Sequence, residues 1–146
     1  MVKAYKGLAN LIALCVALQA SFVALGWFLV MGDLEDGQTL AEGWDYNIGH
    51  ILHSIVGLML IPLLAIALLI VAFRAKAIPD GVKFASFVLL AVVLQVAFAF
   101  VAFGVPAIGA LHGLNAIVVL GLALTCARKA AAVEGAGAHA GAPATV

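Results

Sequence analysis

The chain has 146 residues, 66% of them hydrophobic and only 10% charged, and its mean hydropathy is +1.25. A soluble domain of this size lacks the polar surface to cover so many apolar side chains. The composition therefore excludes a soluble globular protein and predicts an integral membrane protein in a lipid bilayer. The formal net charge is zero, so we expect no nucleic acid among its partners.

The first apolar run predicts a transmembrane helix. Lys3 and Lys6 precede an uncharged stretch from Gly7 to Gly32. At about 1.5 Å per residue, a helix of this length crosses a hydrocarbon core of about 30 Å. The run is longer than the apolar core of a signal peptide, and no small-residue cleavage site follows it. We therefore expect a retained first span over residues 7–31.

An acidic segment with several glycines separates the first apolar run from the second. Several glycines within a polar stretch are typical of a loop. Trp44 and Tyr46 follow where aromatic residues favour the membrane interface. The second span is expected over residues 47–73, with Pro62 interrupting its hydrogen bonding. The acidic residues of the loop are Asp33, Glu35, Asp36, Glu42 and Asp45, and its glycines are Gly32, Gly37 and Gly43.

Two further spans follow a turn at Ile78-Pro79-Asp80-Gly81. The uncharged stretch beyond Lys83 is long enough for two helices, and Gly104-Val105-Pro106 is the natural break because proline suits a first helical turn. We expect spans over residues 84–103 and 106–127. Residues 130–146, which include His139, have little to bury and are expected to form a disordered cytoplasmic tail.

The charges predict the orientation of the chain. All seven basic residues flank span ends that lie on one side in a four-helix topology, whereas five of the seven acidic residues fall in the loop on the other side. The positive-inside rule then places both termini in the cytoplasm. The fold class predicted is an all-α, up-down-up-down four-helix bundle. The basic residues are Lys3, Lys6, Arg74, Lys76, Lys83, Arg128 and Lys129.

The two halves of the chain resemble each other at their polar positions. Gln19-Ala-Ser-Phe in the first span matches Gln95-Val-Ala-Phe in the third, and Leu-His53-Ser in the second matches Leu-His112-Gly in the fourth. Polar residues are scarce in membrane spans, so these matches predict two helical hairpins. Both hairpins begin on the same side, which makes the repeats parallel.

His53 and His112 are the candidate ligands of a metal. Each lies six residues into its span, so both are expected roughly 9 Å below the outer surface. They face each other across the diagonal of the bundle, roughly 11–14 Å between helix axes. That space suits an iron in a flat macrocycle, and we therefore predict one b-type haem between them. Ionisable residues inside a membrane span favour a functional role.

The neighbouring candidates have alternative interpretations. Gly57 and Gly109 either give clearance to a porphyrin face or pack between helices. His50 is an interfacial residue, a haem propionate contact, a proton relay or a replacement ligand. Gln19 and Gln95 form hydrogen bonds between helices, orient the histidines or contact a quinone. Asn115 orients the ring of His112 or bonds a neighbouring helix. Aromatic packing would come from Phe22, Phe98, Phe100 and Phe103.

Four spans with His53 and His112 near the outer starts of the second and fourth resemble one half of haem A synthase, a tandem of such four-helix units. The stretch Leu111–Asn115, followed by an apolar run and Ala127-Arg128-Lys129, resembles a family of short bacterial four-helix membrane proteins catalogued as a domain of unknown function. The similarity covers roughly residues 5–129 and implies a bacterial cytoplasmic membrane. In haem A synthase an acidic residue precedes the second-helix histidine by one turn. His50 stands there in this chain, so the resemblance implies haem binding rather than haem modification.

The sequence therefore predicts an electron carrier, or a haem-bearing subunit of a larger membrane complex, rather than an enzyme. Its partner would be a quinone or a periplasmic redox protein, and a homo-oligomer is an alternative assembly. Two other functions stay open. One is a cofactor-free structural or assembly subunit, whose small-residue helices suit lateral packing. The other is a zinc or copper site made by His50, His53 and His112, since imidazole suits both metals.

Overall fold

The computed structural model describes the backbone of residues 1–39 and 47–140, with side chains as far as residue 136. All secondary structure in these ranges is helical, and four helices are long and apolar enough to span a membrane. The predicted all-α fold is confirmed, while Glu42, Trp44, Asp45 and Tyr46 lie outside the described residues. The elements are α1 (Val2–Glu35), α2 (Ile48–Ile55), the π-helical turn η1 (Val56–Leu60), α3 (Ile61–Arg74), α4 (Gly81–Ala102) and α5 (Ile108–Ala140).

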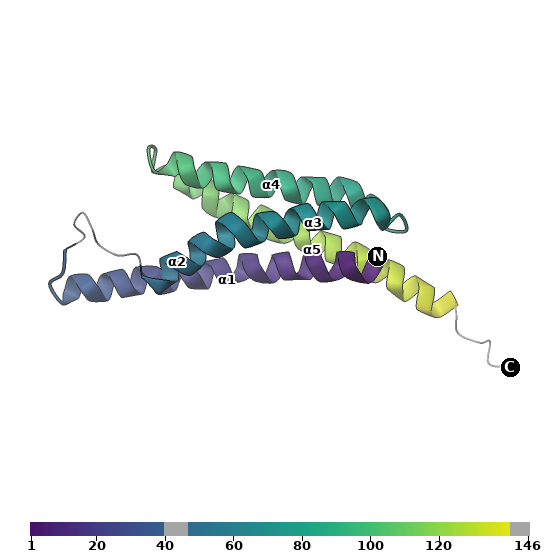
Figure 1. Ribbon diagram of the computed structural model, residues 1–146, viewed down its shortest axis with the longest axis horizontal. Helices are drawn as coiled ribbons and strands as arrows, with labels where there is room; N and C mark the ends of the chain where they lie inside the picture. The colour runs from purple at the N-terminus through teal and green to yellow at the C-terminus, as the bar shows by residue number, and fades with distance from the viewer. Residues whose placement is uncertain (40–46, 141–146) are drawn as a thin grey trace.

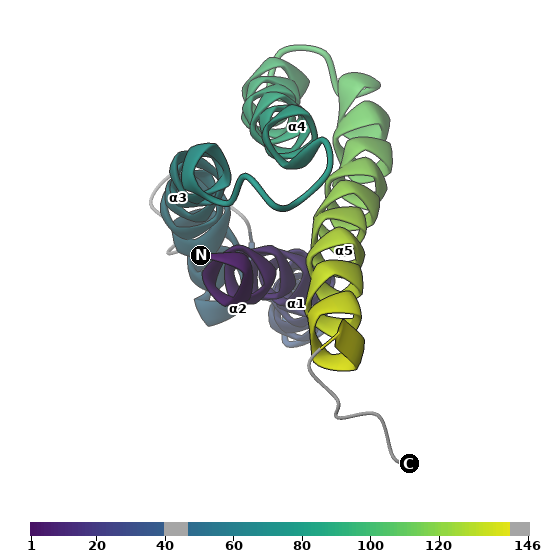
Figure 2. The ribbon, with the colours of Figure 1, turned by 90° about the vertical axis from the view of Figure 1, so that its right-hand side faces the viewer.

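The helices form a closed ring of contacts. The first hairpin packs α1 against α2, η1 and α3, and the second packs α4 against α5. Contacts between α3 and α4 and between α5 and α1 join the hairpins. Viewed along the bundle, α3 and α5 lie on opposite sides of it (Figure 2). Side chains of the second and fourth spans are thereby able to meet across the interior.

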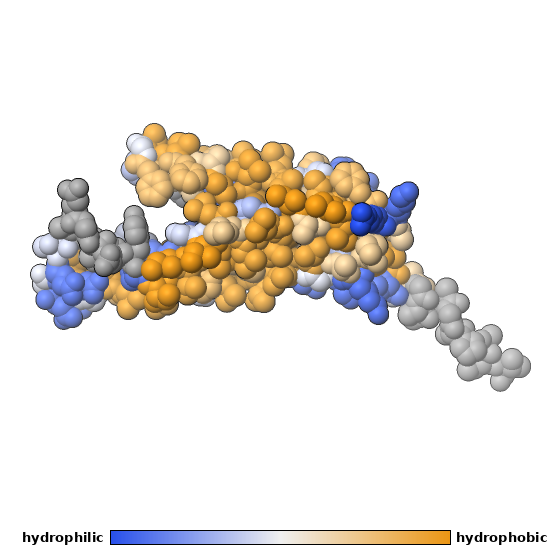
Figure 3. Space-filling model, in the orientation of Figure 1, coloured by the Kyte–Doolittle hydropathy of each residue, from blue (hydrophilic) through white to orange (hydrophobic). Residues whose placement is uncertain are grey.

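The surface has the distribution expected of a membrane protein. Hydrophobic residues cover the middle of the bundle, and hydrophilic residues gather at its two ends (Figure 3). Large apolar side chains such as Phe28, Leu63 and Leu114 are more than half exposed. Lipid can cover this apolar surface, whereas water would leave it unfavourably solvated. The structure thus has the form of a multi-pass membrane protein.

The first helix is longer than the span predicted for it. It continues through Gly32 and Asp33 to Glu35 and ends where Gly37 adopts a φ of +82°. Glycine reaches that left-handed conformation without steric cost, and it commonly follows a helix end. The acidic residues of the predicted loop therefore begin inside the last turns of α1. In Figure 1 this part of α1 extends well past the end of α4.

The buried core lies at the end of the bundle that holds the start of α1 and the α3–α4 loop (Figure 1). Close helix packing through small residues is the usual arrangement in membrane proteins. The hydroxyl of Tyr5 donates to the carbonyl oxygen of Gly81 over 2.9 Å and so joins the starts of α1 and α4. Alanines without solvent exposure fill this end, namely Ala9, Ala65, Ala85, Ala123 and Ala130. Larger buried side chains there include Ile12, Leu68, Val88 and Val119.

The first two spans cross at two glycines. A Cβ atom at Gly49 would lie 2.6 Å from the Cα of Gly26 and 2.7 Å from the carbonyl oxygen of Phe22. Only glycine permits so close a backbone approach. Asn47 strengthens the crossing, since its side chain donates to the carbonyl oxygen of Gly26 over 2.9 Å and accepts from the N–H of His50 as the N-cap of α2. This crossing fixes the start of the second span on α1.

The second span is interrupted by the π-helical turn η1, immediately before Pro62. Proline has no N–H to continue a helical ladder, and π-helical turns place an extra residue in it. The hydrogen-bond pattern of the second span changes over residues 56–60, in the turn that precedes the interruption predicted at Pro62. Gly57 lies within it, one turn after His53.

The fourth span differs from the prediction at both ends. Residues 103–107 form a turn closed by hydrogen bonds from Ile108 to Val105 and from Gly109 to Pro106, so α5 begins two residues after the proline. At its far end α5 continues to Ala140, where a disordered tail was expected from residue 130. Alanine has the highest helix propensity, and a salt bridge joins Lys6 of α1 to Glu134. The side chain of His139 lies outside the described region.

Candidate functional site

A cavity of about 590 Å³ lies between the two hairpins and adjoins the packed end, since Val119 belongs to both. All four spans contribute to its walls, from Val16 on α1 to Val119 on α5. Its volume is within the range of small-molecule binding sites, which combine apolar walls with a few placed polar groups. Here the polar side chains are Gln19, His53, Ser54, Gln95 and His112, and the other lining residues are aliphatic, aromatic or glycine.

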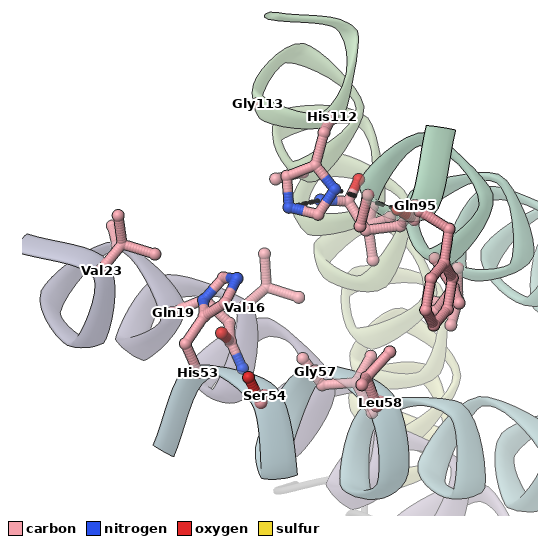
Figure 4. A pocket seen from close by; sticks show the side chains of 18 of the residues that line it. Val16, Gln19, Val23, His53, Ser54, Gly57, Leu58, Gln95, His112 and Gly113 are labelled. Carbon is pink, nitrogen blue, oxygen red and sulfur yellow. Dashed lines mark hydrogen bonds between the residues drawn. The ribbon is translucent and has the colours of Figure 1, made fainter. Parts of the chain in front are cut away.

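The rings of His53 and His112 meet in this cavity. Their centroids are 6.2 Å apart and their planes are inclined by 67°. One ring comes from α2 and the other from α5, so each hairpin supplies one (Figure 4). Both side chains are half-buried. The meeting of the rings expected from the repeat is therefore present.

His112 is held by two residues of the second hairpin. Its Nδ1 donates to the backbone carbonyl oxygen of Gln95 over 2.9 Å, and its Nε2 accepts from the side-chain amide of Gln95 over 3.2 Å. Asn115 in turn donates to Oε1 of Gln95 over 2.7 Å and to the carbonyl oxygen of Ala91 over 2.8 Å. The ring is thereby fixed against α4. Asn115 supports His112 through Gln95 and does not line the cavity.

His53 is held by Gln19, which reaches into the π-helical turn. With its amide oriented to satisfy every partner, Gln19 donates to Nδ1 and to the carbonyl oxygen of His53, and accepts from the N–H of Gly57 over 3.1 Å. The bond to the carbonyl oxygen measures 3.2 Å. In a regular α-helix the N–H of residue 57 would bond the carbonyl of residue 53 directly. The amide of Gln19 is inserted between these two groups, a known cause of local helix distortion.

Each hairpin therefore contributes one glutamine–histidine pair to the cavity. In each hairpin a glutamine of the first helix contacts the histidine of the second, as the matched sequence positions suggested. The support for each pair differs. Gln19 bonds the backbone around its histidine, whereas Gln95 is braced by Asn115. Hydrogen bonds between helices, one of the roles considered for both glutamines, are present in both hairpins.

His50 lies apart from the pair. Its ring packs over Gly26, where an added Cβ would lie 2.6 Å from Cδ2, and it meets the ring of Trp27 edge-on at 5.8 Å. It borders a separate hollow of about 200 Å³ with Ile51 and Ser54. His50 therefore packs in the α1–α2 crossing rather than beside the histidine pair.

The predicted grouping of three histidines around zinc or copper is not formed. Within residues 1–39 and 47–136, no three His, Cys, Asp or Glu side chains converge closely enough to share a metal ion. The ring of His50 packs against Gly26 and Trp27 of α1, whereas the ring of His53, which Gln19 holds, lies beside the ring of His112. His53 and His112 remain as a pair of neighbouring rings, one from each hairpin.

The glycines and aromatic residues proposed for the site are divided. Gly57 lines the cavity, whereas Gly109 packs near Ala102 and does not. Phe100 and Phe103 belong to its wall, and the other two phenylalanines proposed do not. Ser54 and Gly113, which directly follow the two histidines, line the cavity and were not identified from the sequence. Their matching places in the repeat are the signal that indicates them.

No family model, curated protein or solved structure matches the chain. The resemblance to haem A synthase and to the short bacterial four-helix family therefore rests on the sequence motifs alone.

Proposed function

We propose that the protein is a b-type haem protein of the bacterial cytoplasmic membrane, with His53 and His112 as the two axial ligands. The observation that carries the proposal is the meeting of their rings, 6.2 Å apart, on the wall of a cavity of about 590 Å³. Each hairpin would supply one ligand. The helices would be arranged up-down-up-down as two parallel repeats.

The separation of the rings fits ligation on opposite faces of one metal. An imidazole nitrogen binds a first-row metal at about 2 Å, so two opposed rings place their centroids roughly 6 Å apart. The inclination of 67° between the rings is compatible with this, because each ring turns about its own bond to a metal. The observed centroid separation of 6.2 Å is close to the separation expected for two opposed rings.

The hydrogen bonds of His112 also fit a ligand. Metal-binding histidines commonly donate the proton of one ring nitrogen to a carbonyl oxygen, which leaves the other nitrogen with its lone pair. His112 has this arrangement, since Nδ1 donates to the carbonyl of Gln95. A metal at Nε2 would replace the 3.2 Å bond from the Gln95 amide. Gln95 and Asn115 would then keep the ring aligned.

The chain's own residues favour electron transfer. Haem supplies a one-electron couple, and ligation by two histidines leaves no open iron position for oxygen. Apolar side chains on the cavity wall, such as Phe100 and Val96, would keep water from the macrocycle. A quinone or a periplasmic redox protein is the proposed partner. The protein would act alone, as a homo-oligomer or as a subunit of a larger membrane complex.

The orientation follows from the charges. Tyr5 bonds Gly81, and Lys129 lies 3.8 Å from Asp80, so the start of α1, the α3–α4 loop and the later part of α5 share one end of the bundle. All seven basic residues belong to these segments or flank them. By the positive-inside rule this end faces the cytoplasm. The histidine pair would then lie nearer the outer surface, and a cytoplasmic reporter fused to the C-terminus would be active.

Absorption spectroscopy tests the proposal directly. The full chain is expressed with haem available, purified in detergent and assayed as the pyridine haemochrome. We expect one b-type haem per chain and a Soret band with the sharp bands of a six-coordinate, low-spin iron. His53→Ala and His112→Ala should each abolish the low-spin spectrum, because each removes one axial ligand.

His50→Ala is the matched control, since this histidine lies on the same helix as His53 but outside the pair. It should retain the wild-type spectrum. Haem absent from the wild-type protein, or retained with unchanged bands in both ligand variants, contradicts the proposal. Loss of the wild-type spectrum in His50→Ala would mean that His50 is a ligand and that the pair is assigned wrongly.

A cofactor-free assembly subunit is the second candidate, and one observation favours it. Both histidines already have hydrogen-bond partners within the protein, Gln19 for His53 and Gln95 for His112. Such pairs stabilise membrane bundles by about 0.6 kcal/mol on average. This function leaves the cavity without a role. It predicts that removing either histidine lowers the stability of the purified protein and changes no absorption band.

A further inference from the structure

The two histidines of the pair are bonded in opposite senses. His112 uses Nδ1 toward a backbone carbonyl oxygen, whereas His53 has its Nδ1 against a side-chain amide nitrogen of Gln19. A neutral imidazole has one N–H donor and one acceptor nitrogen, and its partners decide which is which. The partners can therefore be used to locate each proton.

For His112 the assignment follows from the backbone. The carbonyl oxygen of Gln95 only accepts, so the Nδ1 that lies 2.9 Å from it must carry the proton. The amide nitrogen of Gln95 only donates, so Nε2 is the acceptor at 3.2 Å. Asn115 fixes which way that amide faces, because its own nitrogen donates to Oε1 of Gln95. His112 is thus the Nδ1–H tautomer.

For His53 the assignment follows from the π-helical turn. The N–H of Gly57 donates to the amide oxygen of Gln19, and the carbonyl oxygen of His53 accepts from the amide nitrogen. These two backbone groups, which cannot exchange roles, orient the amide. Its nitrogen then faces Nδ1 of His53, which must accept. The proton of the neutral ring is therefore on Nε2.

We propose that Gln19 is a positioning residue that holds His53 as the Nε2–H tautomer, opposite to the Nδ1–H tautomer that the Gln95 backbone imposes on His112. The π-helical turn accompanies this arrangement, because the amide of Gln19 stands between the N–H of Gly57 and the carbonyl oxygen of His53, which also accepts from the N–H of Val56. The two rings then have unlike nitrogens: a donor at His53 Nε2 and a lone pair at His112 Nε2.

One consequence rests on the proposed haem function. A metal ligand must offer a lone pair, so His112 is prepared to bind through Nε2 as it stands. His53 must first move its proton from Nε2 to Nδ1, and the amide of Gln19 must turn to accept it. The two ligands are therefore not equivalent. His112 already offers the lone pair of Nε2, whereas His53 can offer one only after the amide of Gln19 has turned.

Nitrogen NMR tests the proposal without any cofactor. The full chain is labelled with ¹⁵N-histidine in a haem-deficient host and measured in detergent micelles, where long-range ¹H–¹⁵N correlations distinguish N–H from acceptor nitrogens. Single-histidine variants assign the signals. We expect His53 to show an acceptor Nδ1 and His112 an acceptor Nε2. The same protonated nitrogen in both rings overturns the proposal.

Substitutions then ask whether Gln19 is the cause. In Gln19→Glu the carboxylate only accepts, so Nδ1 of His53 should change to the N–H type. In Gln19→Leu, which avoids a charge in the membrane, the fixed acceptor signal of Nδ1 should be lost to exchange between tautomers. Gln95→Leu is the matched control: His112 should stay Nδ1–H, because its partner is a backbone carbonyl that the substitution leaves in place.

An unchanged acceptor signal at His53 Nδ1 in a folded Gln19 variant overturns the role given to Gln19. These results do not depend on haem. A protein that binds no haem but shows the two tautomers contradicts only the proposed function, and a haem protein with like tautomers contradicts only this inference.

Discussion

The two ends of the bundle are built in opposite ways. At the end that holds Tyr5 and the α3–α4 loop, alanines such as Ala123 are fully buried and the helices are in close contact. At the end that holds His53 and His112, the helices surround a cavity of about 590 Å³. The same four helices form both ends, so the difference lies in the side chains that face inward.

This difference separates stability from binding. Close packing of small residues drives helix association in membranes, where burial from lipid gives little, so the packed end is where the fold is held together. The open end replaces packing with hydrogen bonds between glutamines and histidines. Those bonds keep the cavity walls in place while leaving space between them. Substitutions at the two ends should therefore affect different properties.

The largest expected effect comes from Ala123→Leu. Ala123 has no exposed surface, and extra methylene groups in a packed interior cost about 1–3 kcal/mol or more. We expect the unfolding free energy to fall by about 3 kcal/mol, because several helices meet at this position. The unfolding free energy is measured in mixed micelles, with circular dichroism as the signal of unfolding.

Ala116→Leu is the matched substitution two turns earlier on the same helix. Ala116 lines the cavity, so a leucine there has room, and we expect the unfolding free energy to change by less than about 1 kcal/mol. The same variant should lose haem absorbance, because the side chain occupies the proposed binding space. Equal destabilisation by the two leucines would show that the ends do not differ in packing.

The α1–α2 crossing is the exception at the open end, and Gly49→Ala tests it. An added Cβ would lie 2.6 Å from the Cα of Gly26. Backbone atoms cannot move aside as a side chain does, so we expect a loss of about 2 kcal/mol in unfolding free energy. Gly121→Ala is the control, since a Cβ there meets none of the described atoms of other helices within 4 Å. The unfolding free energy of this variant should rise by up to about 1 kcal/mol, because alanine has the higher helix propensity. A stable Gly49→Ala protein would mean that the crossing is looser than described.

Much of the fold could be predicted from the sequence because membrane spans depend on composition. The four apolar runs, bounded by charges at residues such as Lys83 and Arg128, predicted the four helices that could span a membrane, although α1 and α5 extend beyond the predicted ends. A hydrogen-bonding role was also considered for Gln95, since polar residues inside spans must find partners, but His112 was not identified as its partner. The first hairpin has a glutamine and a histidine, Gln19 and His53, at the matching sequence positions.

Other features depend on three-dimensional contacts that no local pattern encodes. The role of Gly49 arises from where α1 and α2 cross, so attention to Gly57 and Gly109 beside the predicted haem missed it. The place of His50 follows from the same crossing, which turns its ring toward Gly26. The insertion of Gln19 into residues 56–60 could not be foreseen, because Pro62 indicates an interruption but not what fills it.

Asn115→Ala sharpens the comparison between the hairpins at the open end. The side chain donates to Gln95 and to the carbonyl oxygen of Ala91, and losing both bonds should cost about 1 kcal/mol of unfolding free energy. The signals of His112 should broaden in the nitrogen NMR spectrum, because Gln95 is no longer braced, while those of His53 stay unchanged. Thr125→Ala, which removes a bond from the hydroxyl to Gly121 within α5, should cost less. Broadening of both histidines would show that the two glutamine–histidine pairs are coupled.

The smallest effect is expected at the packed end, where Lys6 of α1 forms a salt bridge with Glu134 beyond the apolar part of α5. The two side chains are 36% and 25% exposed, so screening by solvent limits the contribution to about 0.5 kcal/mol. Lys6→Met should therefore leave global unfolding nearly unchanged. Hydrogen exchange over residues 130–136 should become faster, because this pair adds to the packing of Ala130 and Val133 in joining that part of α5 to the bundle. Lys129→Met is the control, since it removes the contact to Asp80 and leaves Lys6 in place. Equal exchange in wild type and Lys6→Met would mean that helix propensity and the packing of Val133 maintain the end of α5 without the salt bridge.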